Sequence, residues 1–289
     1  MRLYVCIATV GRSDLVCRVV EQLRLQSRAP DGIIVVGAEE GDVAQVRNAS
    51  IPVEVLLSAR GSCVQRNRAI ARARTSADLI VFFDDDFLPA TDYLEKVECL
   101  FEGDARVVGA TGRIIADGVK GRGYRFDEAA ELIAADSTPL NAADYPAEAL
   151  YGCNMALRLS ALDDLWFDEA LPLYGWLEDI DLTFRLGRRG RLIRSDHFAG
   201  VHMGAKAGRT SGVRFGYSQI ANPLYMLAKQ SAPVHLAWRM IGRNLAANLL
   251  RSVWPEPHID RRGRLRGNCI ALAHLATRRL DPRHILVMR

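Results

Sequence analysis

The sequence lacks the features of a disulfide-rich, zinc-binding or membrane-spanning protein. Its six cysteines are scattered and form no C-x-x-C pair, which argues against a disulfide framework and a zinc site. No uninterrupted apolar run reaches about 18 residues, so no membrane-spanning helix is expected. The N-terminal run "LYVCIATV" is too short for a signal-peptide core and has no small-residue cleavage site. We therefore expect a reduced, cytoplasmic protein that begins with a strand.

Lysine is absent from the last part of the chain, although arginine is abundant there. From residue 232 to the end there are 11 Arg, no Lys and three acidic residues, a net charge of +8. The first 231 residues carry 27 basic and 31 acidic groups, a net charge of −4. A basic tail on a mildly acidic body predicts an anionic partner surface, and we expect membrane lipid rather than nucleic acid.

The overall composition of the chain is that of an ordinary globular protein. With 289 residues, 49% hydrophobic and 25% charged, the chain is long enough for one large or two small folded units. In the first hundred residues, continuous apolar runs alternate with helical patterns, which is typical of a parallel sheet covered on both faces. Strands are predicted at 3–10, 31–38, 53–59 and 77–86, and helices at 13–27 and 62–76.

This alternation predicts a doubly wound, mostly parallel α/β sheet, whose ligands bind beyond the carboxyl ends of the strands. Another strand is predicted at 105–116, an irregular excursion at 117–148, and a strand running into a helix at 149–165. A further helix is expected at 176–190 and a glycine-rich basic loop at 203–216. We expect a catalytic domain at 1–220 and a basic amphipathic helical region at 221–289.

Three carboxylates follow the fourth predicted strand in "VFFDDDFLP". Asp84, Asp85 and Asp86 would repel one another unless a hard divalent cation neutralises them, and Mg²⁺ and Mn²⁺ prefer such oxygen ligands. A solvated acidic turn is the alternative. The position at a strand end that faces the ligand crevice favours metal binding.

Two further groups of residues are candidates for chemistry. Glu178, Asp179 and Asp181 lie near the start of a predicted helix, where they either supply a general base or stabilise the helix end. Arg66 and Asn67 lie at the start of another helix, where an anion or nucleotide contact competes with a solvated face. Other candidates are His197 and His202, and the loop residues Lys206, Arg209 and Arg214, which would close over phosphates.

Together these residues resemble family 2 glycosyltransferases of the GT-A type over residues 3–205. The resemblance lies in the D-D-D after an apolar strand, in "GSCVQRNRAI", and in the run from "YGCNMALRLSAL" through "FDEALPLYGWLEDIDLTFRLGRRG". It implies an inverting transfer of sugar from a nucleotide-diphosphate donor to an acceptor hydroxyl, with Mn²⁺ or Mg²⁺ on the diphosphate. It also implies a GT-A fold, here followed by a C-terminal helical region.

The resemblance implies a role for each matching position. Asp179 would be the catalytic base, oriented by Glu178 or Asp181, while Asp86 and His202 would hold the metal. The nucleotide-binding positions would be Thr9, Arg12, Glu39, Arg66, Asn67, Asp84 and Asp85, with Lys206 and Arg209 near the phosphates. The turn "VVGAEEGD" departs from the family pattern, because Gly37 and Ala38 occupy the usual acidic positions. The resemblance therefore implies either a UDP-sugar or a dTDP-sugar as the donor.

The acceptor and the tail allow several interpretations. A glycan or lipid-linked acceptor is expected, and the tail either attaches to the inner face of the cell membrane or forms a homodimer contact. Two other functions compete with glycosyl transfer. A sugar-nucleotide nucleotidyltransferase would need a glycine-rich loop after the first strand, where "ATVGRSD" has one glycine. A non-catalytic nucleotide-sugar-binding module would not need the acidic residues to be intact.

Overall fold

The computed structural model describes residues 1–206, 210–254 and 256–288. The chain forms two compact units. Unit 1 consists of residues 1–60, 64–166 and 183–208, and unit 2 of residues 61–63, 167–182 and 209–289. The predicted division between residues 220 and 221 falls inside helix α8 (Gly212–Ala228).

Unit 1 is built on one mixed sheet with the strand order β3-β2-β1-β4-β8-β6-β9-β5, and β7 pairs with β9. The first four of these strands pair in parallel, as the sequence predicts. β8 then runs antiparallel to both β4 and β6. The strands are β1 (Leu3–Ala8), β2 (Gly32–Gly37), β3 (Glu54–Leu57), β4 (Leu79–Asp84), β5 (Phe87–Pro89), β6 (Val107–Asp117), β7 (Asp144–Pro146), β8 (Asn154–Arg158) and β9 (Arg191–His202).

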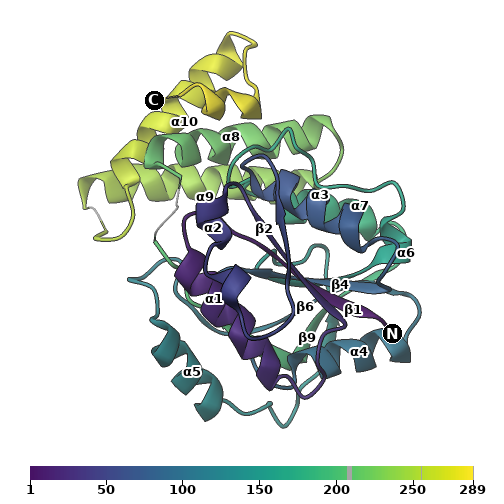
Figure 1. Cartoon of the computed structure of the whole chain (residues 1–289). Helices are drawn as coiled ribbons and strands as arrows, with labels where there is room; N and C mark the ends of the chain where they lie inside the picture. The colour runs from purple at the N-terminus through teal and green to yellow at the C-terminus, as the bar shows by residue number, and fades with distance from the viewer. Residues whose placement is uncertain (207–209, 255, 289) are drawn as a thin grey trace. The chain divides into compact units, whose positions relative to one another are not determined.

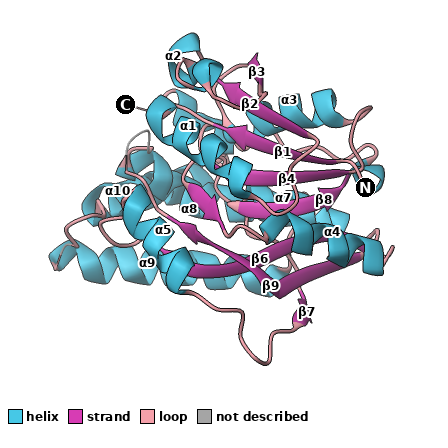
Figure 2. Ribbon diagram, turned by 60° about the horizontal axis from the view of Figure 1, so that its bottom comes forward, coloured by secondary structure: helices cyan, strands magenta, loops and turns pink. Residues whose placement is uncertain are grey.

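Helices cover both faces of this sheet (Figure 2). Apolar residues of α1, α4 and α5 share one core with alternate residues of β4, including Val81 and Phe83. Phe82 points to the other face, where Arg66 of α3 lies over its ring. The helices that lie wholly or partly in this unit are α1 (Ser13–Gln22), α2 (Glu40–Val43), α3 (Ser62–Ala73), α4 (Tyr93–Gly103), α5 (Phe126–Ala135), α6 (Leu159–Leu162) and α7 (Glu178–Leu186), with short 3₁₀ turns at Leu23–Leu25 and Val46–Asn48.

Unit 2 contains the C-terminal helices α8, α9 (Val234–Val253) and α10 (Arg261–Ala276), which pack together, and the 3₁₀ turn Pro282–Leu286 (Figure 1). Glycines allow α8 and α10 to come very close, because a Cβ at Gly216 would lie 2.0 Å from the Arg264 carbonyl oxygen. A buried amide network adds specificity. Asn248 donates to Gln219 at 2.7 Å and to Asn268 at 2.8 Å.

The structure corrects three details of the sequence prediction. The segment 117–148 is not irregular throughout, because it contains α5 and β7. The glycine-rich loop is shorter than expected, because α8 begins at Gly212. The twelve-residue strand β9 was not predicted, and it carries both His197 and His202. The predicted α/β class with a C-terminal helical region is confirmed.

Candidate active site

The three aspartates lie where the sequence places them, at the carboxyl end of β4. Asp84 is the last residue of β4, and Asp85 and Asp86 form the turn into β5. Asp85 and Asp86 are buried, whereas Asp84 keeps part of its side chain exposed. Buried carboxylates are costly unless they are paired or hydrogen-bonded, so their partners decide what this turn does.

Asp85 is held by the loop that follows β1. The hydroxyl of Thr9 donates to Asp85 Oδ2 at 2.8 Å, and the guanidinium of Arg12 donates to Oδ1 at 2.5 Å. Burial raises the pKa of Asp85 to about 7, although Arg12 and Thr9 favour the charged form. Thr9, Arg12 and Asp85, three of the predicted nucleotide-binding residues, therefore form one connected group.

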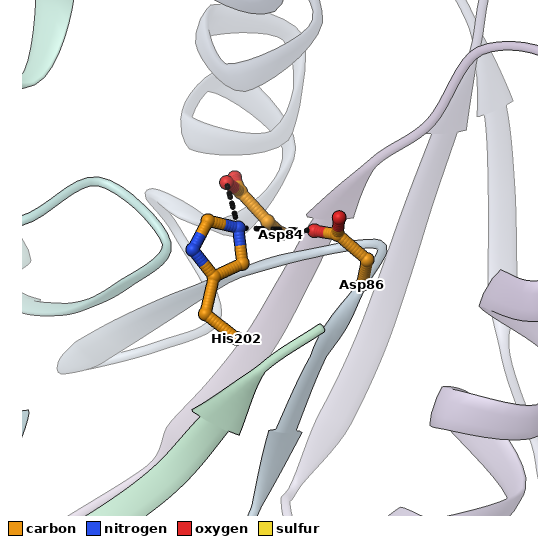
Figure 3. A group of neighbouring side chains, drawn as sticks. All are labelled: Asp84, Asp86 and His202. Carbon is orange, nitrogen blue, oxygen red and sulfur yellow. Dashed lines mark ion pairs between the residues drawn. The ribbon is translucent and has the colours of Figure 1, made fainter. Parts of the chain in front are cut away.

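Asp86 points to His202 at the end of β9 (Figure 3). His202 Nε2 lies 3.3 Å from Asp86 Oδ1 and 3.9 Å from Asp84 Oδ2. Burial acts to raise the pKa of Asp86, but His202, Arg12 and the backbone N–H of Ala205 outweigh it and lower that pKa. Burial acts to lower the pKa of His202, but Asp117 and Asp86 raise it to about 10.

The other edge of the His202 ring contacts residues that sequence reasoning missed. His202 Nδ1 lies 3.3 Å from Oδ1 of Asp117, the last residue of β6, and 3.3 Å from the Tyr151 hydroxyl. Tyr151 in turn donates to Asp117 at 3.2 Å. A carboxylate on the second ring nitrogen is the usual arrangement behind a metal-binding histidine, because it fixes the orientation of the ring.

The donor set of Asp84, Asp86 and His202 fits a divalent ion. One ligand atom from each residue lies within 4.8 Å of the others. An octahedral ion about 2.1 Å from its ligands requires neighbouring ligand atoms about 3 Å apart, so a small closure of this group suffices. Two carboxylate oxygens with one imidazole suit Mn²⁺ better than an all-oxygen set would.

Two more of the predicted donor-site residues, Arg66 and Lys206, contact Asp84 or the loop that follows β6. Arg66 is buried and donates to Asp84 Oδ1 at 2.8 Å and to the Gly152 carbonyl at 3.1 Å. Lys206 Nζ donates to the carbonyls of Gly118 and Val119, each at 3.0 Å. Asn67 lies half-buried on α3, and Arg209 lies outside the described residues.

The acidic turn after β2 has a structural function that was not predicted. Glu39 is the N-cap of α2, and its side chain accepts from the backbone of Asp42. Asp42 is buried and accepts from the backbone N–H groups of Gly11 at 2.6 Å and Ala38 at 2.9 Å. Asp42 thereby joins the loops that follow β1 and β2.

In unit 2, the predicted catalytic carboxylates occupy the first turn of α7, as expected. Glu178 is buried, and Asp179 is half-buried and accepts from the N–H of Ile180 at 2.8 Å. Asp181 is completely buried and accepts from Lys229 and Ser231. Asp181 thus differs from Asp179, because it connects α7 to the end of α8.

Comparisons with known proteins give one family match and several solved structures with a similar fold. The family model described as glycosyl transferase family 2 matches residues 4–166. A search of curated proteins found no match to the sequence. Among solved structures, a mannosyltransferase from Pyrobaculum calidifontis in complex with GDP-Man and Mn²⁺ aligns with a TM-score of 0.58 and 17% identity, covering 99% of this chain and 78% of that one.

A second similar structure is S. aureus TarS, residues 1–349. It aligns with a TM-score of 0.53 and 16% identity, covering 87% of this chain and 73% of that chain. The same protein in complex with UDP-GlcNAc gives a TM-score of 0.53 and 15% identity, covering 78% of this chain and 67% of that chain. At these identities the likeness shows a shared fold.

Proposed function

Because the chain belongs to glycosyl transferase family 2, we propose that it transfers a sugar from a nucleotide-diphosphate donor to an acceptor hydroxyl with inversion. The observation that carries this proposal is the group of Asp84, Asp86 and His202 at the end of β4, with Asp117 behind the histidine. The family assignment makes the chain a glycosyltransferase and removes the support for a nucleotidyltransferase or a non-catalytic module.

We assign the metal to Asp84, Asp86 and His202, with Mn²⁺ preferred over Mg²⁺. A divalent ion bound there would stabilise the negative charge that develops on the leaving diphosphate. Arg12 contacts Asp85 and lies 3.5 Å from Asp86, so it favours the charged form of both carboxylates and orients them. Exclusion of water by the buried turn strengthens these electrostatic interactions.

We assign proton removal to Asp179, on the resemblance of its E-D-x-D sequence to the family pattern. Its half-exposed carboxylate in the first turn of α7 accepts the proton from the acceptor hydroxyl late in the displacement. A single displacement from the face opposite the leaving group inverts the anomeric carbon. We propose that the donor carries UDP, dTDP or GDP, since similar structures hold GDP-Man and UDP-GlcNAc.

We further propose that the acceptor is lipid-linked and that unit 2 contacts an anionic membrane surface. None of the described helices combines the length and apolar character that crossing a bilayer requires. Helix α9 nevertheless exposes large apolar side chains, and it carries exposed arginines and no acidic residue. Trp238 is 55% exposed and Leu249 is 61% exposed on this helix. A homodimer through the same face would bring Arg239 and Arg243 toward like charges, which disfavours it.

The function is tested by measuring nucleotide release from UDP-, dTDP- and GDP-sugars with Mn²⁺, with and without lipid-linked acceptors. We expect release from donors of one nucleotide class, stimulated by acceptor. Asp86→Asn should be inactive, whereas the control Asp127→Asn, an exposed aspartate on α5, should behave as the wild type. No release from any donor by a protein that binds nucleotide and Mn²⁺ would contradict the proposal.

A further inference from the structure

Four side chains of unit 2 meet around the ammonium group of Lys229. Its Nζ atom lies 2.6 Å from Asp168 Oδ2 and 2.9 Å from each carboxylate oxygen of Asp181. Ser231 donates a further hydrogen bond to Asp181, and the hydroxyl of Tyr225 donates to Asp168 at 2.8 Å. Asp181 and Ser231 are fully buried, so the hydrogen bond between them is shielded from solvent, whereas Lys229 and Asp168 keep part of their side chains exposed.

The way in which α8 ends makes this arrangement possible. Lys229 is the C-cap of α8, and Gln230 follows with φ of 58°, in the left-handed region. The N–H of Ser231 then returns to the Met226 carbonyl at 2.9 Å, which closes the helix end. This tight reversal directs both Lys229 and Ser231 to the same carboxylate of Asp181.

The cluster connects two segments that flank one strained stretch of backbone. Asp168 lies before this stretch and Asp181 lies after it, in the first turn of α7. Between them, Leu173 and Leu177 have φ of 59° and 77°, which is unfavourable for residues with a side chain. Such a conformation persists only when its surroundings hold it, and Leu177 immediately precedes Glu178 and Asp179.

Helix α8 holds the same stretch at a second point. Asn222 is buried and donates from Nδ2 to the Trp176 carbonyl at 2.8 Å. The ring of Phe215, also on α8, packs edge-on against Trp176 at a centroid distance of 5.6 Å. The residue before Leu177 and the turn after it are therefore both fixed by α8, at Asn222 and at Lys229.

We propose that Lys229 is a positioning residue for glycosyl transfer, which fixes the first turn of α7 and thereby the carboxylate of Asp179. This proposal rests on the proposed function, since it assigns Asp179 to proton removal. One cation bridges two carboxylates on either side of the strained stretch, so its loss releases both ends together. A displacement of about 1 Å in a catalytic group can cost about 100-fold in rate. The C-terminal helices are then part of the catalytic apparatus, in addition to any contact with a membrane.

The experiment compares Lys229→Met and Lys229→Arg with the control Lys96→Met, which changes an exposed lysine of α4. A double variant, Lys229→Met with Asp181→Asn, removes both charges of the Lys229–Asp181 pair, so that no buried charge at Asp181 is left without its cation. For each protein we would measure thermal stability, UDP binding with Mn²⁺, kcat and donor KM. Hydrogen exchange of the segment 174–183 reports its order without any substrate.

The proposal predicts that Lys229→Met lowers kcat about 100-fold while donor KM and UDP binding stay within about twofold. Lys229→Arg should restore part of kcat, and hydrogen exchange at 174–183 should rise in Lys229→Met and in the double variant. The double variant should regain thermal stability but not kcat. A kcat near that of the wild type in the folded double variant would overturn the positioning role. If the wild type releases no nucleotide, the proposed function fails, and unchanged exchange at 174–183 would then refute the positioning role separately.

Discussion

His202 and Asp117 are paired on the ring edge that faces away from Asp86, with His202 Nδ1 3.3 Å from Asp117 Oδ1. This pairing leaves Nε2 directed to Asp86 and Asp84, the other members of the proposed metal site. An imidazole held in this way presents one nitrogen to an ion with little freedom to rotate. Asp117 is thus expected to act on metal affinity without touching the metal.

Removing the charge of Asp117 should weaken metal binding. Partners behind a metal-binding histidine typically contribute 10–100-fold in affinity, so Asp117→Asn should raise the Kd for Mn²⁺ by about that factor. Titration calorimetry with UDP present measures this change. The exposed Asp127→Asn serves as the matched control, and equal Mn²⁺ affinity in both variants would show that Asp117 has no such role.

Metal choice should follow the donor set. Because His202 would contribute a nitrogen ligand to the proposed site, we expect Mn²⁺ to support UDP binding at lower concentration than Mg²⁺ does. Asp86→Ala should abolish the difference between UDP affinity with and without Mn²⁺, and EDTA should have the same effect on the wild type. If the Kd for UDP were independent of Mn²⁺ in the wild type, the group at the end of β4 would not be a metal site.

The sequence predicted the candidate site residues of each unit where the signal was local. The apolar run of β4 followed by aspartates predicts a strand end, and the acidic turn at Glu178 predicts the start of α7. Each of these two signals is contained in a short stretch of neighbouring residues. His202 was predicted as a metal ligand through the family pattern, and it does join Asp84 and Asp86 in one group.

The parts that were missed depend on contacts between distant residues. β9 has the mixed sequence "RLIRSDHFAGVH", and its strand character comes from pairing with β6 and β5. Lys229 and Asp181 are 48 residues apart, so no local pattern joins them. Asp117 was detectable, because it follows an apolar strand in the same way as Asp84. The helical pattern "FDEAAELIAA" of α5 was likewise present in the sequence.

Replacing the proposed base should separate chemistry from binding. Asp179→Asn keeps the shape of the side chain but cannot accept the proton, so we expect kcat to fall by about 100-fold or more while donor affinity is retained. Steady-state kinetics combined with UDP titration tests this. Substantial remaining turnover would mean that another group removes the proton.

The stability of unit 2 should depend on pH through His274. Its Nδ1 lies 3.0 Å from the Tyr217 hydroxyl, and burial, followed by His284 and Arg279, lowers the pKa of His274. The unfolded chain therefore binds a proton more readily, so this contribution is complete above about pH 6.5 and is lost as the pH falls below it. Thermal unfolding between pH 8 and 5.5 should show a smaller decrease in His274→Gln than in the wild type. Parallel curves for the two proteins would exclude this contribution.

Membrane attachment should require both the apolar and the basic side chains of α9. Interfacial binding combines buried apolar area with attraction of about 1 kcal/mol per basic residue near an anionic surface. We expect the full chain to float with phosphatidylglycerol vesicles and to stay unbound with neutral phosphatidylcholine vesicles. Trp238→Ser with Leu249→Ser should reduce flotation, as should Arg239→Gln with Arg243→Gln, whereas Lys96→Gln on α4 should not. Absence of flotation at low salt would contradict membrane attachment. A stable dimer that the same α9 substitutions dissociate would assign this face to protein–protein contact instead.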